Sequence, residues 1–120
     1  MAARQQPVEI LRLHLCDGDR YRGRPLHEAI VDKCREMRIA GATVLRGLEG
    51  YGETGDLHGH HLTGHGDPLV IVVVDTPEQI AALAPVVESM MNTGVIARSS
   101  AEAIRVEKAD PSRLRTRSPV

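Results

Sequence analysis

The chain has 120 residues, of which 42% are hydrophobic and 26% charged, and its formal net charge at pH 7 is −1. This length suits one domain with a modest core, and the near-zero charge disfavours a general polyanion binder. No apolar run approaches the roughly 20 residues that span a bilayer, and the N-terminal MAARQQP lacks the apolar core of a signal peptide. We therefore predict a cytoplasmic protein without direct membrane insertion.

Two further features of the composition narrow the class. The two cysteines, Cys16 and Cys34, make no metal or disulfide pattern, which fits a reducing compartment. The only aromatic residues are Tyr21 and Tyr51. Because proteins that bind single strands normally present several stacking side chains, nucleic acid is not a predicted partner.

The first half of the chain predicts a strand, a helix and a strand. Residues 1–7 are expected to form a loose arm. Val8–Cys16 alternates between apolar and other residues, as a half-buried strand does. A helix is predicted over Pro25–Arg38, because proline suits a first helical turn and apolar residues then recur at helical spacing; Gly41 is expected to end it. Ala42–Leu48 is the second predicted strand.

The second half repeats this order. The third predicted strand, Leu69–Asp75, is apolar on both faces, so both faces should be covered. Helices cover only one face of a single sheet in a domain this small, and the other face therefore predicts an oligomer. Thr76 and Gln79 occupy capping-box positions at the start of a second helix, which Pro85 should kink and Thr93-Gly94 should close.

The predicted end of the domain is a loop or short bridge over Val95–Ser100, a last strand over Ala103–Lys108, and a mobile tail over residues 109–120. Residues 8–108 then form a single domain. The order β-α-β-β-α-β is the ferredoxin-like arrangement, an α+β fold with a four-stranded antiparallel sheet and two helices on one face.

This topology places three connections at one end of the sheet. A right-handed crossover makes the first two strands point the same way, so the loops Asp17–Arg24, Gly50–Asp67 and Thr93–Ser100 meet there. The second of these is far longer than the two to five residues or so that a hairpin needs, and such loops are usually functional or mobile. A binding site is expected at this end.

The long loop holds four of the chain's six histidines within eight positions: His58, His60, His61 and His65. Imidazole is a good ligand for zinc or copper, and this spacing permits two or three ligands from one loop. The alternative is a solvated polar loop, and it is favoured because no cysteine or fixed carboxylate pattern supports a metal.

Arginines gather around the same end: Arg20, Arg22 and Arg24 precede the first helix, and Arg46 and Arg98 can approach it. Guanidinium groups bind phosphate or carboxylate well. The alternative is a solvated rim of arginines paired with Asp17, Asp19 or Glu49. No Ser-His-Asp arrangement, P-loop or spaced carboxylate pair is present, so the sequence predicts no catalytic residue and no enzyme.

Several short runs resemble the PII signalling proteins. Gly41-Ala42-Thr43-Val44 followed by Gly50-Tyr51-Gly52 resembles the PII segment that leads into the long T-loop, and Thr93-Gly94 with Ile96 resembles the start of the PII B-loop. A PII-like family of uncharacterised proteins, domain of unknown function 190, is more similar still. Its likeness rests on Asp19-Arg20-Tyr21, Gly23, Pro25-Leu26, Ala40–Gly52 and Pro68–Asp75, and the resemblance covers about Leu11–Val106.

The resemblance implies a regulatory homotrimer that binds an adenine nucleotide between subunits and signals through its long loop to a partner protein such as a transporter or an enzyme. The residues it assigns to a nucleotide or anion, together with the arginines above, are Arg20, Arg22, Arg46, Gly50, Tyr51, Gly52, Thr93, Gly94 and Arg98. Gly94–Ser100 lacks the lysines of the PII B-loop, and Glu53-Thr54 stands where PII has glutamine, so a differently posed nucleotide or another ligand stays open. The rival hypothesis is a zinc or copper protein similar to the CutA-type trimers.

Overall fold

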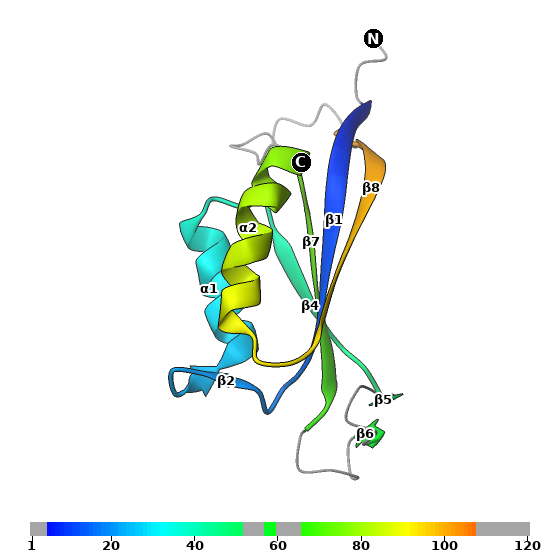
Figure 1. Cartoon of the computed structure of the whole chain (residues 1–120). Helices are drawn as coiled ribbons and strands as arrows, with labels where there is room; N and C mark the ends of the chain where they lie inside the picture. Colours follow the sequence, from blue (N-terminus) through cyan, green and yellow to red (C-terminus); the bar gives the residue numbers. More distant parts are fainter. Residues whose placement is uncertain (1–4, 52–56, 60–65, 108–120) are drawn as a thin grey trace.

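The computed structural model describes residues 5–51, 57–59 and 66–107. Its elements follow the predicted order, with short additional strands (Figure 1). They are β1 (Gln5–Cys16), β2 (Arg20–Tyr21), β3 (Arg24–Pro25), α1 (Leu26–Glu36), β4 (Ala42–Arg46), β5 (Glu49–Tyr51), β6 (Leu57–Gly59), β7 (Pro68–Asp75), α2 (Pro77–Met90) and β8 (Val95–Ile104). Within the described residues, neither helix is long and apolar enough to cross a membrane.

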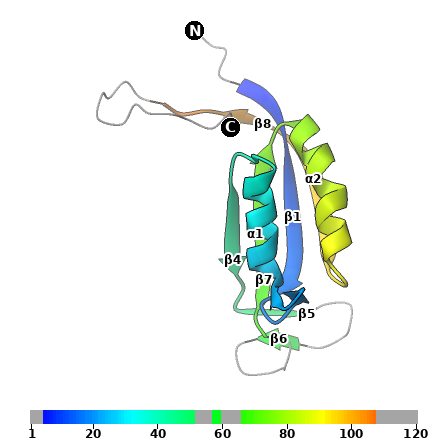
Figure 2. The same ribbon diagram turned by 90° about the vertical axis from the view of Figure 1, so that its left-hand side faces the viewer.

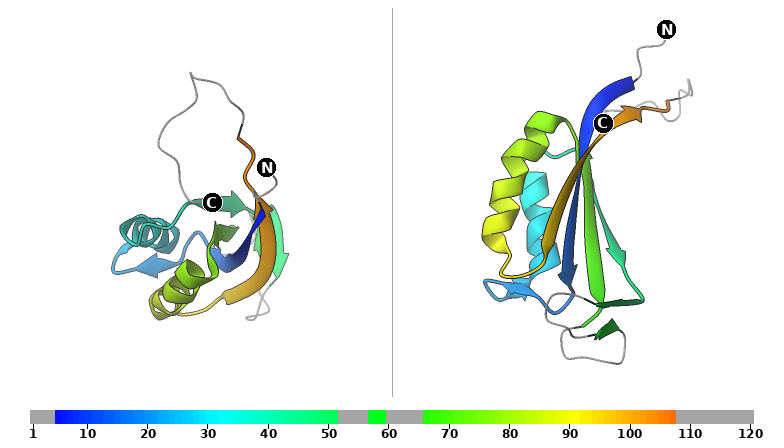
Figure 3. Two further views of the ribbon diagram at one scale, coloured as in Figure 1. Left: turned by 90° about the horizontal axis from the view of Figure 1, so that it is seen from above. Right: turned by 45° about the vertical axis from the view of Figure 1, so that its right-hand side comes forward.

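The main sheet has the strand order β4-β7-β1-β8, and every neighbouring pair is antiparallel. Both helices pack on the same face of this sheet, as Figures 1 and 2 show from two directions. Seen from above, the sheet curves around the helix pair (Figure 3). The predicted α+β, ferredoxin-like fold is therefore confirmed.

The core lies between the sheet and the two helices. Alternate residues of β1 and β7 point into it and are almost fully buried, and both helices contribute their apolar stripes. The buried members are Leu11, Leu13, Leu15, Leu26, Ala29, Ile30, Cys34, Leu69, Ile71, Val73, Ile80, Leu83, Val87 and Met90. Burial raises the pKa of the Cys34 thiol to about 11, so this cysteine acts as a packed apolar residue.

Helix α1 ends differently from the prediction. Arg38, with φ of 61°, takes the left-handed position that we had assigned to Gly41. The N–H of Ile39 donates to the carbonyl of Cys34 and that of Arg38 to the carbonyl of Arg35, which is a Schellman motif. Helix α2 begins as predicted, because the N–H of Gln79 donates to the Thr76 hydroxyl at 3.2 Å. The kink at Pro85 stays a prediction.

Two predicted segments at the ends of the domain were wrong. Gln5–Pro7, expected in a loose arm, belong to β1 and pair with β8. Among the strands that the structure describes, β8 alone pairs with β1 there, so a proline without an N–H is tolerated. Val95–Ser100, expected as a loop or short bridge, is the first part of β8, which ends at Ile104 instead of reaching Lys108. Hydrogen bonding to β1 holds this segment as a strand, although its apolar and polar residues do not alternate.

The long loop also contains unpredicted structure. β5 and β6 pair as a small hairpin, Glu49 opposite Gly59 and Tyr51 opposite Leu57, beneath the main sheet (Figure 1). The predicted second strand therefore stops at Arg46, and Leu48 is 92% exposed between β4 and β5. Residues 1–4, 52–56, 60–65 and 108–120 lie outside the described residues, and the predictions of mobility for the tip and termini concern them.

Candidate functional site

The connections that were expected to meet do lie at one end of the sheet. The N–H of Asp17, just after β1, donates to the carbonyl of Asp67, just before β7, at 2.9 Å. Arg46, the last residue of β4, reaches both of them. The turn before β8 is close as well, because a Cβ on Gly94 would lie 2.4 Å from the carbonyl oxygen of His14. We call this the loop end of the sheet.

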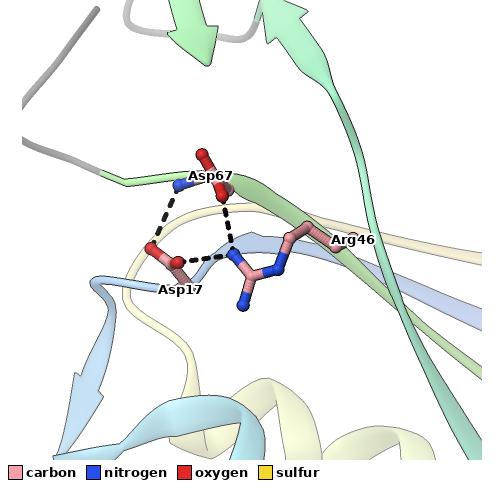
Figure 4. A network of polar contacts seen from close by, with 3 residues as sticks. All are labelled: Asp17, Arg46 and Asp67. Atoms are coloured by element: carbon pink, nitrogen blue, oxygen red, sulfur yellow. Dashed lines mark hydrogen bonds and ion pairs between the residues drawn. The ribbon is translucent and has the colours of Figure 1, made fainter. Parts of the chain in front are cut away.

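A three-residue ion cluster closes the loop end, and we call Asp17, Arg46 and Asp67 the neck cluster (Figure 4). One nitrogen of Arg46, Nη1, lies 2.7 Å from Oδ2 of Asp17 and 2.7 Å from Oδ2 of Asp67. The other oxygen of Asp17, Oδ1, accepts the N–H of Asp67 at 3.0 Å. Arg46 and Asp67 bracket the β5–β6 hairpin, so the cluster holds together the two ends of the long loop.

Glycine and proline allow the backbones to approach at this point. The N–H of Gly47 donates to the carbonyl of Pro68 at 2.8 Å, and a Cβ on Gly47 would lie 2.9 Å from Cγ of Pro68. Gly66 has φ of 88°, and a Cβ there would lie 1.8 Å from Oδ1 of Asp17. A side chain at either position would push the neck apart because the space is filled, and at Gly66 the φ is in addition one that L-residues rarely adopt.

The cluster is held by charge at a largely exposed site. Arg46 lowers the pKa of Asp17 through its hydrogen bond, and the N–H of Asp67 acts in the same direction; both aspartates in turn raise the pKa of Arg46. The Arg46 side chain is 56% exposed, against 29% for Asp17 and 15% for Asp67. Two carboxylates and one guanidinium leave the cluster with one negative charge at pH 7.

Thr93 and Gly94, both predicted to contact a nucleotide, line a surface depression of about 130 Å³ between the end of α2 and the start of β8. Its other lining residues are Glu88, Met91, Asn92 and Ile96. Gly94 has φ of 122° and lies against the backbone of β1, which leaves no room for a side chain. A glycine is therefore required at the floor of this depression.

The predicted arginines do not form one group. β2 and β3 form a tight hairpin with positive φ at both central residues, Arg22 and Gly23, as in a type I′ turn. Arg22 lies over the ring of Tyr21, with Cζ 5.0 Å from the ring centre, and Arg24 pairs with Asp32 at 2.7 Å. Arg20 is exposed on β2. These contacts fit a solvated rim, but Arg24 pairs with Asp32 instead of the expected Asp17, Asp19 or Glu49. Ligand binding by Arg20 and Arg22 stays a prediction.

Arg98 is also displaced from its predicted place. It lies in β8 opposite Leu11, three residues beyond Val95, so about 10 Å of strand separates it from the start of β8. Its Nη2 lies 2.7 Å from Oε1 of Glu9. Within the described part of the chain, this ion pair engages Arg98 away from the neck cluster.

The remaining predicted contacts are only partly placed. Gly50 and Tyr51 lie in β5, directly after the neck, whereas Gly52 lies outside the described residues. His58 is in β6, and His60, His61 and His65 are outside the described residues. Among the residues that the structure describes, no group of three or more histidine, cysteine or acidic side chains is arranged to hold a metal.

Asp67 was missed by the sequence-based prediction, although it is central to the neck cluster. It stands 50 residues from Asp17 and 21 from Arg46, and no periodicity connects them. The available signal was local: an acidic residue between Gly66 and Pro68, immediately before a buried strand. One half of the cluster, an arginine of this end paired with Asp17, was among the alternatives that the sequence left open.

The face of the sheet opposite the helices is apolar and partly open. Val70, Val72 and Val74 of β7 are half-buried there, and Leu45 of β4 is 52% exposed. A shallow hollow of about 330 Å³ lies at the far edge of this face, lined by Ala40, Gly41, Ala42, Thr43, Val72 and Val74. The predicted two-sided apolar character of β7 is thus confirmed, and neither helix of the described residues lies over this second side.

A comparison with known protein families shows which family the chain belongs to. Residues 8–103 match the family DUF190, described as "Uncharacterized ACR, COG1993". The chain belongs to this family. A UPF0166 protein of Aquifex aeolicus is 26% identical over 98 residues, which is 80% of this chain and 92% of that protein. The UPF0166 protein MJ1524 of Methanocaldococcus jannaschii is 32% identical over 92 residues, 74% of this chain and 84% of its own.

Solved structures share the fold at low identity. CPII of Thiomonas intermedia K12, a nitrogen regulatory PII-like protein solved with ADP, AMP and bicarbonate, superposes with a TM-score of 0.64 at 20% identity, over 87% of this chain and 94% of that one. The divalent ion tolerance protein CutA1 of Ehrlichia chaffeensis has a TM-score of 0.54 at 12% identity, over 88% and 87%. The predicted resemblance to PII-like proteins is confirmed at the level of family and fold.

Proposed function

We propose that this DUF190 protein is a PII-like regulatory protein that binds a small anionic metabolite, in the first place an adenine nucleotide, between the subunits of a homotrimer. The ligand lies at the loop end of the sheet. It contacts the depression at Thr93 and Gly94 and the base of the long loop at Arg46, Gly50 and Tyr51. Ligand binding changes the conformation of the long loop, and this change alters how the protein fits a partner protein.

The observation that carries this proposal is the depression at Thr93 and Gly94. It coincides with the segment that the resemblance to PII assigns to the nucleotide, and it lies at the same end as the base of the long loop. Its volume of about 130 Å³ is well below the roughly 300 to 1,000 Å³ of ordinary ligand pockets. One chain therefore offers part of a nucleotide site, and a second copy would complete it.

The open face of the sheet supports the oligomer that this site needs. An apolar β-sheet face with Val70, Val72 and Val74 half-buried gains hydrophobic free energy when a second copy covers it, by roughly 25 cal/mol per Å² of apolar surface. The PII-like relative solved with ADP and AMP supports the choice of adenine nucleotides as the first ligands to test.

The first test is isothermal titration of the protein with AMP, ADP and ATP, after its oligomeric mass has been measured. We expect heat from at least one nucleotide, and Thr93→Ala should weaken that binding. Val86→Ala, at a partly buried residue of α2 that does not line the depression, is the control and should bind as the wild type does. A verified trimer that binds none of the three nucleotides would contradict the nucleotide part of the proposal.

The rival proposal, a divalent-metal protein, has one structural observation in its favour, the likeness to CutA1. It assigns zinc or copper to His58, His60, His61 and His65. Replacing all four by alanine should abolish zinc binding in a titration while leaving nucleotide binding unchanged. Unchanged zinc affinity in this variant would remove the rival proposal.

A further inference from the structure

We propose that the neck cluster is an anion-operated latch: Arg46 fastens the base of the long loop to the end of β1 through Asp17 and Asp67, and an incoming phosphate or carboxylate group competes for Arg46 and releases it. This inference rests on the proposed function for the identity of the ligand and adds how that ligand reaches the loop. Asp17 and Asp67 then compete with the anion for Arg46 and so oppose its binding.

The geometry leaves Arg46 able to exchange partners. Both carboxylates contact the same nitrogen, Nη1 (Figure 4). Nη2 and Nε donate no hydrogen bond to any of the described residues. The side chain is 56% exposed. A guanidinium binds oxyanions best through two parallel N–H groups, and an anion can approach the vacant edge before the bonds to the aspartates break.

The latch connects three segments that are distant in the sequence. Asp17 follows β1, Arg46 ends β4 and Asp67 precedes β7, and every bond between them crosses from one segment to another. The hairpin β5–β6 begins three residues after Arg46. When Arg46 moves to an anion, the loop keeps the bond from Gly47 to Pro68 and the two hydrogen bonds between Asp17 and Asp67 but loses both ion pairs, so its attachment to the sheet is loosened.

The charge of the neck cluster determines whether the two aspartates raise or lower its affinity for an anion. The two aspartates exceed the single guanidinium, so an anion must overcome them to engage Arg46. By thermodynamic linkage, what stabilises the closed latch weakens anion binding, and what weakens the latch strengthens it. Removing one carboxylate should therefore raise anion affinity, whereas a carboxylate that merely aimed Arg46 at a ligand would lower affinity on removal.

The first experiment measures ADP binding by titration in Asp17→Asn. Asparagine keeps an oxygen for the N–H of Asp67 but cannot accept from Arg46 in place of Oδ2. We expect affinity to rise about two- to fivefold, the size of one exposed ion pair. Asp32→Asn, which removes the surface partner of Arg24, is the matched control and should leave affinity unchanged. Equal or weaker binding by Asp17→Asn would overturn the latch.

A double-mutant cycle separates the latch from plain repulsion between Asp17 and the ligand. In an Arg46→Gln background, the gain from Asp17→Asn should vanish if it acts through Arg46. A gain of the same size without Arg46 would mean that the carboxylate only repels the anion, and the latch would be wrong.

Amide hydrogen exchange measures how often the bonds between Asp17 and Asp67 open. The N–H of Asp67 is bonded to Asp17, and that of Asp17 to Asp67. Loss of the ion pairs takes away the support that Arg46 gives to these two bonds. ADP should therefore speed exchange of both amides in the wild type, and inorganic phosphate should do so at matched ionic strength, whereas neither should in Arg46→Gln. Slower or unchanged exchange with both anions overturns the latch. Phosphate-dependent opening without nucleotide binding refutes only the nucleotide site.

Discussion

Carboxylates tie the connections together at both ends of the sheet, but the two ends are built in opposite ways. At the end away from the long loop, Asp75 is fully buried and accepts the N–H groups of Ala40 at 2.8 Å and Thr76 at 2.7 Å. At the loop end, the partner of the aspartates is the exposed side chain of Arg46. Backbone donors have no alternative partner, whereas an arginine can move to a ligand.

This contrast assigns one end to stability and the other to response. Asp75 joins the end of β7 to the connection between α1 and β4, and Gln79 adds weak bonds to the carbonyls of Met37 and Arg38 at 3.4 Å. These groups tie the connection between α1 and β4 to the end of β7 and the start of α2. The neck cluster holds a loop whose position the fold does not otherwise require, so its loss should change behaviour more than stability.

The largest effect on stability should come from Asp75→Ala. This change removes a fully buried carboxylate and leaves the partly buried N–H groups of Ala40 and Thr76 without their acceptor. We expect it to cost about 2 to 4 kcal/mol of unfolding free energy. Urea denaturation measures it. Asp17→Asn at the other end should cost clearly less. An equal loss in the two variants would break the distinction between a structural end and a responsive end.

The next effect concerns glycines at the two ends. Gly94→Ala forces a side chain into a positive φ and against the carbonyl of His14, which should cost about 2 to 3 kcal/mol and remove ligand binding at the depression. Gly41, at the opposite end, has open space around its Cβ position, so Gly41→Ala should stay within about 0.5 kcal/mol. Thermal melts with and without ADP give both quantities.

The sequence predicted the fold well where burial produces a pattern. The alternation of β1, the apolar run of β7 and the capped start of α2 all reflect side chains packed in one core, and these elements were confirmed. It failed at β8, because an edge strand with one bonded neighbour needs no strict alternation. It also failed at the end of α1, where the Schellman bonds hold Arg38 in a conformation usually left to glycine.

The meeting of the loops at one end of the sheet was predictable, but the contacts within the candidate site were not. Topology brought the right loops to one end, and the motif at Thr93-Gly94 marked the depression. Which charges pair there depends on contacts between residues far apart in the chain, such as Asp17 and Asp67, and no local pattern encodes them. Arg98 shows the reverse error, since its predicted loop is a strand and its partner is Glu9.

The smallest effect, and the most specific to the neck cluster, is its response to pH. Arg46 lowers the pKa of Asp17 in the folded protein, so the unfolded chain binds this proton more readily than the folded one. The stabilisation is therefore complete above the ordinary pKa of 3.8 and is lost as the pH falls through the lowered value.

The difference in urea midpoint between the wild type and Asp17→Asn should be present at neutral pH and shrink in acid below that range. In an Arg46→Gln background it should be much reduced at every pH, because the principal cause of the lowered pKa is gone. A difference that survives both treatments would mean that Asp17 acts through its backbone bond to Asp67, as Asp75 acts at the other end, and that both ends of the sheet are structural.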